Sequence, residues 1–299
     1  MYAFEFQRAT DAQAAAALLR NDPDAKIVAG GQSLIAAMKL RLAAPSTLVD
    51  INRIPGIRDI RVEGDTLVIG AGARHADVEA HPEVKRRLPA LAALAGGIGD
   101  RQVRALGTLG GSIANNDPAA CYPAAVLGLN ATVVTDRRSI AADDFFVGMY
   151  ETALEPDELI TAVRFPCPRQ AAYVKFRNPA SRFALVGVMV ARGVGGGAAN
   201  GSGGGNGGSG GNGGDVRVAV TGAADAVFRC EPLERALSAD FSAAAARAVT
   251  IPAEGLNDDL HGSAEYRAHL IPVLAARAVE QALGQSSMQA SSQSSTPSP

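Results

Sequence analysis

Two glycine pairs beside small hydroxyl residues are the segments of this sequence whose composition and spacing could bind a ligand. The first runs Ala29-Gly30-Gly31-Gln32-Ser33-Leu34, and the second runs Gly107-Thr108-Leu109-Gly110-Gly111-Ser112, followed by Asn115-Asn116-Asp117-Pro118. Glycine lets the backbone approach a ligand closely, and successive free N–H groups in such a turn form a concavity for anionic oxygens. Neither loop contains Lys or Arg, so backbone groups would hold a diphosphate there. Two such loops suit the pyrophosphate of a dinucleotide better than a nucleoside triphosphate.

For one glycine pair alone, a tight turn without a ligand is the better interpretation. The same holds for residues 70–75 and 98–100, which lack the third glycine of a Rossmann fingerprint. Two matching pairs, each between apolar runs, favour a binding site instead. A helix that starts just after such a turn would add its N-terminal partial charge.

The composition narrows the function classes. The chain has 299 residues, 47% of them hydrophobic, which is enough for two domains or one large one. Its formal net charge is −2, and charges of both signs are mixed along it, so we expect no nucleic-acid surface. The three cysteines are widely spaced, and an iron–sulfur cluster would need four thiolates, so none is expected on this chain. We expect no metal site, and we place His75 and His81 on a helix surface.

The N-terminal segment carries no targeting signal that we can identify. Residues 1–6 have neither a basic region nor an apolar run. No apolar segment reaches the length of a membrane span. The sequence therefore predicts a cytoplasmic protein.

The first half of the chain predicts an α/β unit followed by a second group of strands and helices. Asp11 and Ser33 are placed to cap the first two helices, and the strand that leads into the first glycine loop is expected to be buried. The expected strands are 4–6, 26–29, 47–50, 59–63, 66–69, 131–135, 139–141 and 158–165, and the expected helices are 10–19, 34–40, 75–94 with breaks at Pro82 and Pro89, and 123–129.

The second half predicts a sheet and three helices. The expected strands are 173–177, 185–191, 216–222 and 226–228, and the expected helices are 232–237, 242–249 and 264–283. Residues 193–214 are almost wholly Gly, Asn and Ser, so we expect a flexible insertion at the tip of a hairpin. The Ser/Gln/Pro-rich tail 285–299 is expected to be disordered.

Several segments together resemble a known family. Besides the two glycine segments they are Asp157-Glu158-Leu159-Ile160, Phe165-Pro166, residues 173–184 (YVKFRNPASRFA) and residues 258–267 (DDLHGSAEYR). They are similar to the FAD-binding medium subunits of molybdenum hydroxylases, which include aerobic carbon monoxide dehydrogenase and bacterial xanthine dehydrogenases with separate subunits. The resemblance covers residues 2–283. Gln32 and residues 178–182 are most similar to the carbon monoxide dehydrogenase branch.

The resemblance implies an α+β fold with two parts. A two-part α/β FAD-binding region of the vanillyl-alcohol-oxidase (PCMH) type would span residues 1–176, with subdomains at about 1–55 and 56–176. A C-terminal antiparallel sheet-and-helix domain would span residues 177–284. The insertion 193–214 would lie in this second domain.

The resemblance also implies a function in electron transfer. FAD on this chain would receive electrons from [2Fe-2S] clusters on a small partner subunit and pass them to an external acceptor. A large partner subunit with the molybdenum cofactor would oxidise the substrate, and the assembly would be a dimer of heterotrimers. We expect no catalytic acid or base on this chain, whose residues would bind, orient and tune the flavin.

The implied cofactor contacts fall on the two loops and on two single residues. Backbone N–H groups of both glycine pairs would hold the pyrophosphate, Asp117 would bind ribose or adenine or else only cap a helix, and Lys175 would lie near the flavin or else at a solvated strand edge. The residues assigned to FAD are Ala29, Gly30, Gly31, Gln32, Ser33, Leu34, Thr108, Leu109, Gly110, Gly111, Ser112, Asp117 and Lys175.

Two positions depart from the family pattern, and two other functions remain open. Cys121 stands where relatives often have Asp, and Ala105 stands where they often have Asn. A self-sufficient flavin oxidase or reductase, similar to the UDP-N-acetylenolpyruvoylglucosamine reductases, would need an acid of its own, and no residue stands out for that role. A non-catalytic nucleotide-binding module is the third possibility.

Overall fold

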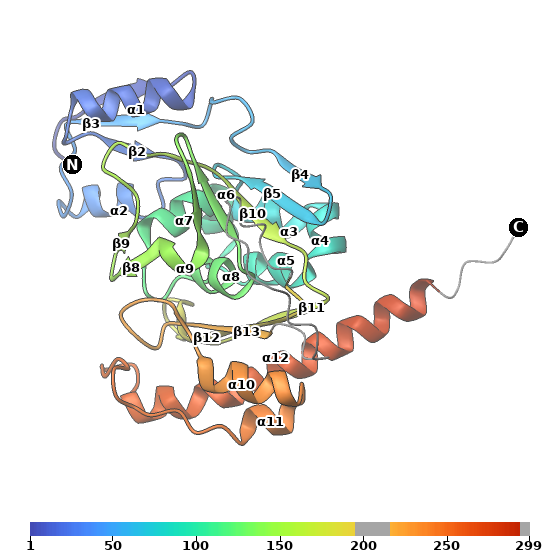
Figure 1. The fold of residues 1–299 in the computed structure, drawn as a ribbon. Coiled ribbons are helices and arrows are strands. Elements are labelled where there is room, and N and C mark those ends of the chain that lie inside the picture. The colour runs from blue at the N-terminus through green and yellow to red at the C-terminus, as the bar shows by residue number, and fades with distance from the viewer. Residues whose placement is uncertain (195–215, 294–299) are drawn as a thin grey trace, which may run out of the picture.

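The structure is a computed structural model that describes residues 1–194 and 216–293. Its elements form three tiers: a small sheet with two helices, a middle tier of helices and antiparallel strands, and a C-terminal sheet covered by helices (Figure 1). None of the helices in these two ranges combines the length and the apolar character that a membrane span needs.

The first tier is a three-stranded parallel sheet in the order β1-β3-β2. It consists of β1 (Glu5–Arg8), α1 (Ala12–Asn21), β2 (Lys26–Val28), α2 (Leu34–Lys39) and β3 (Thr47–Asp50). The Asp11 side chain caps α1 by accepting a hydrogen bond from the Ala14 N–H, as predicted. The prediction of a buried β2 was wrong, because this strand lies at the sheet edge and none of its residues is fully buried.

The middle tier contains a five-stranded antiparallel sheet in the order β4-β5-β10-β6-β7. Its strands, together with the two-stranded β8–β9 hairpin, are β4 (Ile60–Glu63), β5 (Thr66–Gly70), β6 (Thr132–Thr135), β7 (Ser139–Ala141), β8 (Phe146–Gly148), β9 (Glu151–Thr152) and β10 (Ile160–Pro166). The predicted hairpin of β4 and β5 and the predicted pairing of β6 with β7 are both present.

Seven helices belong to this tier. They are α3 (His75–Ala80), α4 (Pro82–Arg87), α5 (Pro89–Gly96), α6 (Arg101–Leu106), α7 (Leu109–Asn115), α8 (Tyr122–Gly128) and α9 (Ala142–Phe145). Pro82 and Pro89 each occupy the first position of a helix, where proline's missing N–H costs nothing. The predicted breaks at these prolines therefore occur.

The C-terminal tier is a four-stranded antiparallel sheet in the order β11-β12-β13-β14. Its elements are β11 (Gln170–Arg177), β12 (Ala184–Arg192), β13 (Val216–Thr221), β14 (Phe228–Arg229), α10 (Glu231–Ala239), α11 (Ala243–Arg247) and α12 (Ala264–Gln293). Most of the predicted insertion lies outside the described residues. Helix α12 continues to Gln293, beyond its predicted end at residue 283, while the predicted disorder of the tail 285–299 stays a prediction.

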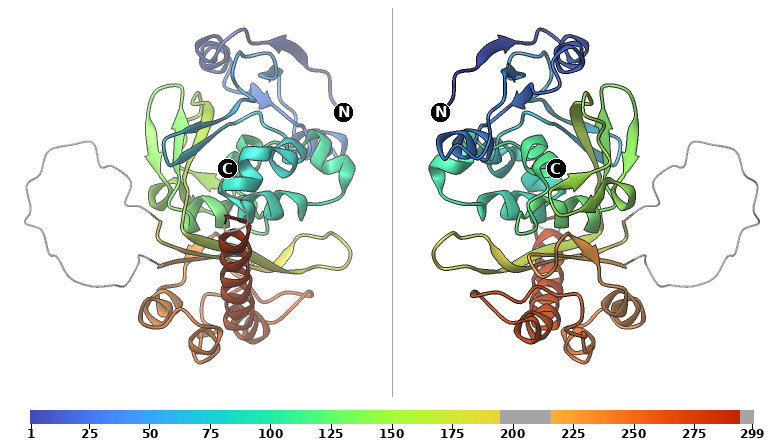
Figure 2. Two further views of the ribbon diagram at one scale, coloured as in Figure 1. Left: turned by 90° about the vertical axis from the view of Figure 1, so that its right-hand side faces the viewer. Right: turned by 90° about the vertical axis from the view of Figure 1, so that its left-hand side faces the viewer.

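Two hydrophobic clusters form the core. One extends from the first two tiers to one face of the C-terminal sheet and includes Leu67, Tyr122 and Met189. The other lies between the C-terminal sheet and its helices and includes Val218 and Ile271. Helix α8 packs against β12 and β13 and so joins the middle and C-terminal tiers. The side views show the middle tier on one side of the C-terminal sheet and the C-terminal helices on the other (Figure 2).

Candidate dinucleotide site

The fold brings the two glycine loops into contact. The first loop follows β2, and the second follows α6. A Cβ atom added to Gly30 would overlap the carbonyl oxygen of Leu106 and would lie 2.9 Å from the α-carbon of Gly107. Only glycine at position 30 allows the two backbones to come this close.

The first loop presents a run of free backbone donors. Within the described part of the chain, no hydrogen bond is made by the backbone N–H groups of Gly30, Gly31, Gln32 and Ser33. Gly31 has a left-handed φ of +71°, and Gln32 and Ser33 are exposed. Free N–H groups around a left-handed residue form the kind of concavity that binds anionic oxygens. The predicted cap from Ser33 to α2 is absent, which leaves that hydroxyl available as well.

The backbone N–H groups of the second loop donate hydrogen bonds to acceptors within the protein. The N–H of Leu109 donates to the Ala73 carbonyl at 3.0 Å, the N–H of Gly110 donates to the Ala71 carbonyl at 2.8 Å, and the N–H of Gly111 donates to Thr108 Oγ1 at 3.1 Å. The hypothesis that the Gly110 and Gly111 amides bind pyrophosphate directly therefore needs correction.

The buried Gly110 has a packing role instead. A Cβ on Gly110 would lie 2.5 Å from the Cβ of Ala71, so glycine here allows α7 to lie against the segment that follows β5. Thr108 is buried and caps α7. Of the second loop, Gly111 remains exposed and Ser112 remains half-exposed. These two residues form the accessible surface of the second loop.

Asp117 is engaged by the protein through both of its oxygens. Oδ1 accepts a hydrogen bond from the Ala119 N–H at 2.8 Å, and Oδ2 accepts one from the Tyr150 hydroxyl at 3.2 Å. Burial and the neighbouring Asp117 raise the pKa of Tyr150. The carboxylate thus closes a turn after α7 and fixes the tip of the β8–β9 hairpin, which favours the structural alternative for this residue.

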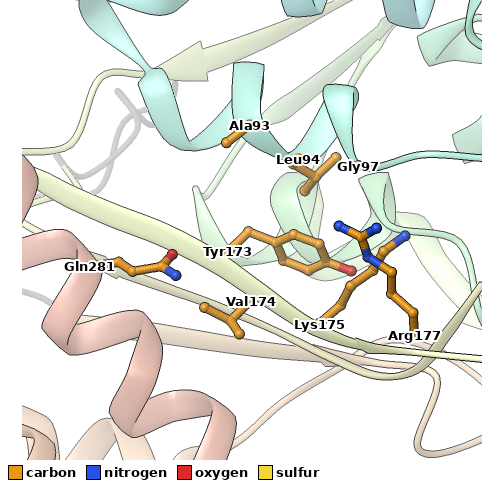
Figure 3. Close-up of a pocket in the computed structure, with 8 residues that line it drawn as sticks. All are labelled: Ala93, Leu94, Gly97, Tyr173, Val174, Lys175, Arg177 and Gln281. Atoms are coloured by element: carbon orange, nitrogen blue, oxygen red, sulfur yellow. The ribbon is translucent and has the colours of Figure 1, made fainter. Parts of the chain in front are cut away.

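Lys175 lies at a cavity of about 240 Å³ between α5, β11 and α12. Figure 3 shows Tyr173, Lys175 and Arg177 extending from β11 toward the end of α5, where Leu94 and Gly97 lie. Alternate residues of a strand share one face, which explains the common direction of the three side chains. Lys175 Nζ donates to Cys121 Sγ at 3.3 Å and to the Arg182 carbonyl at 3.0 Å.

His75 lies beneath the second loop, so its predicted place on a helix surface was wrong. The side chain is buried and packs against the ring of Tyr122, with ring centroids 5.3 Å apart and ring planes tilted by 50°. Its backbone N–H donates to the Gly107 carbonyl at 2.9 Å. Burial, with a smaller contribution from Arg104, lowers the pKa of His75 to about 4. The imidazole is therefore neutral at physiological pH and supports the loop by packing.

Comparison with known proteins decides the family. The sequence profile described as "FAD binding domain in molybdopterin dehydrogenase" matches residues 2–168. The chain belongs to this family. The nicotine 6-hydroxylase medium subunit of Paenarthrobacter nicotinovorans is 37% identical over 274 residues, which cover 89% of this chain and 92% of that protein. The carbon monoxide dehydrogenase medium chain of Hydrogenophaga pseudoflava is 37% identical over 295 residues, 93% of this chain and 96% of that protein.

The fold agrees with that of solved members of the family. A structure of carbon monoxide dehydrogenase from Hydrogenophaga pseudoflava that lacks the Mo-pyranopterin moiety of the molybdenum cofactor superposes with a TM-score of 0.80, at 34% identity, over 95% of this chain and 98% of that one. The molybdopterin dehydrogenase subunit described here is accordingly an FAD-binding medium subunit, and its enzyme class is oxidoreductase.

The arrangement of this FAD-binding subunit fits its cofactor. Free N–H groups at residues 30–33 suit a diphosphate, and a cavity with two cationic side chains, Lys175 and Arg177, lies at the end of α5. No group of three or more metal-ligating side chains occurs in residues 1–194 and 216–293. Arg182, Arg177 and Tyr150 were not predicted as residues of the site. No local sequence pattern shows which distant groups a residue at the tip of a hairpin will contact.

Proposed function

We propose that this FAD subunit transfers electrons within a multi-subunit molybdenum hydroxylase, from iron–sulfur clusters on a small partner subunit to an external acceptor. A large partner subunit would hold the molybdenum cofactor, and the assembly would be a cytoplasmic dimer of heterotrimers. FAD supplies the electron-transfer chemistry when bound. The run of four free N–H groups at residues 30–33, in contact with the second glycine loop, is the observation that carries this proposal.

The pyrophosphate is assigned to the first loop. Gly30, Gly31, Gln32 and Ser33 would donate their backbone N–H groups, and the Ser33 hydroxyl would add a donor. No cation neutralises the phosphates in this loop, so specificity would come from backbone geometry rather than from charge. The remaining residues of the two loops, namely Ala29, Leu34, Thr108, Leu109, Gly110, Gly111 and Ser112, would shape the site by packing or line it.

The flavin ring is assigned to the side of Lys175. Helix α6 lies between two points of the site: Leu106, where the two glycine loops meet, and Gly99, whose carbonyl lies 3.5 Å from Arg182 Nη1. A six-residue helix rises about 9 Å. An extended dinucleotide with its pyrophosphate at the first loop can span that distance and place its flavin ring near Lys175. Lys175 would then place a positive charge beside the ring, where it stabilises a reduced, anionic flavin relative to the oxidised form.

The substrate of the complex is a property of another chain. The two relatives named above act in enzymes whose names point to nicotine and to carbon monoxide, although both are 37% identical to this chain. These equal identities therefore do not indicate which substrate the complex of this chain would oxidise. We also propose a first domain that ends near residue 168, where the family profile ends, because the whole of β11 belongs to the C-terminal sheet.

Purification of the chain with its native partners tests the proposal. We expect the chain to copurify with two further subunits, together with iron, molybdenum and one FAD per chain. Reduction of the bound FAD should require the partners when the complex is given its substrate. A purified single chain that turned over a substrate alone would contradict the proposal and support a self-sufficient oxidase or reductase.

A further inference from the structure

The Lys175 ammonium has two hydrogen-bond acceptors in the described part of the chain, a cysteine sulfur and a backbone carbonyl. Its Nζ donates to Cys121 Sγ at 3.3 Å and to the Arg182 carbonyl at 3.0 Å. No carboxylate in residues 1–194 and 216–293 lies within ion-pair distance of it. A half-buried cation without a counter-charge is costly, so such an arrangement points to a role in binding something negative.

The acceptor at Arg182 is held rigidly. Arg182 has a left-handed φ of 62° in the turn between β11 and β12. Asn178 closes this turn: its Oδ1 accepts from the N–H groups of Ala180 and Ser181, and its own N–H donates to the Phe183 carbonyl. The carbonyl that faces Lys175 therefore has a fixed position.

The acceptor at Cys121 is also fixed. Cys121 is buried, with 5% of its surface exposed, and stands at the start of α8. The Tyr173 hydroxyl lies on the same side, and burial followed by the neighbouring Cys121 raises the pKa of Tyr173. The phenol is therefore neutral. The Lys175 ammonium is thus held between Cys121 Sγ and the Arg182 carbonyl.

We infer that Cys121 is a positioning residue for Lys175, and that its contact with Nζ holds the Lys175 ammonium at the cavity beside the flavin. The inference rests on the proposed function for the flavin part and on the Cys121–Lys175 contact for the positioning part. A carboxylate at position 121 would hold the same ammonium but would compensate its charge. The identity of residue 121 would thereby set how strongly the site favours reduced over oxidised FAD.

The reduction potential of FAD in the purified complex tests this inference. We expect Cys121→Asp and Lys175→Met each to lower the preference for reduced FAD about tenfold, which for a two-electron couple is a shift of about 30 mV to more negative potential. Cys121→Ser keeps a hydrogen-bond acceptor and should leave the potential near that of the native protein. Cys167→Asp adds the same charge at a half-buried cysteine that, unlike Cys121, makes no hydrogen bond with Lys175 in residues 1–194 and 216–293, and should change the potential little.

Two results would overturn the inference. One is equal potentials for Cys121→Asp and Cys167→Asp. The other is an unchanged potential in Lys175→Met, which decides the matter even if Cys121→Asp does not fold.

A second measurement needs no FAD. In the full chain labelled at the lysine ε-carbons, the NMR chemical shift of Lys175 should change in Cys121→Asp but not in Cys167→Asp. A Lys175 signal that is the same in both variants would refute the positioning role. If the native complex bound no FAD, the proposed function would fail together with the flavin part of the inference, while this comparison of chemical shifts would still decide the contact.

Discussion

The carbonyl oxygen of Leu106 lies where a Cβ atom at Gly30 would have to stand, so the end of α6 fills the space that a side chain at position 30 would need. The residues are 76 positions apart in sequence, and their contact joins the two glycine loops. Because the neighbour is backbone rather than a flexible side chain, it cannot move aside cheaply. The shape of the candidate site depends on this contact.

We therefore expect Gly30→Ala to destabilise the protein by about 1–3 kcal/mol through overpacking, and to weaken FAD retention. Urea unfolding of the FAD-free chain measures the first effect, and the FAD-to-protein ratio measures the second. Gly284→Ala is the matched control, since a Cβ there meets nothing within 4 Å. The control should be neutral or slightly stabilising, and an equally harmless Gly30→Ala would refute the close contact.

Arg267 should be among the most sensitive polar residues. It is 3% exposed, and its guanidinium donates to the carbonyls of Leu185 and Gly222 and to both oxygens of Asp259. Arg267→Met leaves two buried carbonyls without a donor, and we expect a loss of about 3 kcal/mol in urea unfolding.

Arg235 provides the comparison for this prediction. Its ion pair with Glu231 is exposed on both sides. Arg235→Ala should change the free energy of unfolding by no more than about 0.5 kcal/mol. Similar losses in the two variants would mean that the Arg267 hydrogen bonds contribute nothing beyond surface charge.

Stability should fall with acidification because of His75. Its pKa falls from 6.5 in the unfolded chain to about 4 in the folded protein, so the unfolded chain binds the proton first. The His75 contribution is present above pH 6.5 and is lost as the pH falls from about 6.5 to about 4. The pKa difference corresponds to about 3 kcal/mol. His75→Gln should flatten the stability curve over this range, whereas the same change at exposed His261 should not.

Glu158 extends the acid sensitivity to lower pH. Hydrogen bonds from the Arg138 guanidinium lower the pKa of Glu158 from 4.5 to about 2. Its contribution is present above pH 4.5 and is lost as the pH falls toward 2. We expect Arg138→Met to move the midpoint of acid unfolding to higher pH, as measured by circular dichroism. An unchanged acid midpoint would show that this pair does not stabilise the fold.

Local signals in the sequence predicted much of the fold. Pro82 and Pro89 mark helix starts because a proline needs no N–H at that position, and Asp11 caps α1 because its carboxylate accepts a free N–H. The predicted end of α12 at residue 283 falls before its end at Gln293. Composition alone does not show that a helix already anchored by packing will continue.

The candidate site was less accessible from sequence, because it depends on distant backbone partners. The glycine pairs marked the loops, but nothing near Gly110 shows that its N–H will donate to Ala71, 39 residues earlier. Nor does any local pattern show that Lys175 will meet Cys121. Contacts of this kind are set by tertiary packing rather than by local propensity.

The FAD content of Gly31→Val, compared with that of the native protein, tests the central claim most directly. Gly31 has a left-handed φ, and a Cβ there would lie 2.8 Å from the side chain of Ile35, so valine would disturb the run of free N–H groups without touching α7. With circular dichroism to verify the fold, absorbance should give one FAD per native chain and less than about a tenth of that in the variant, as expected when a side chain intrudes where backbone meets phosphate. Equal FAD in both folded proteins would contradict a pyrophosphate held by the first loop.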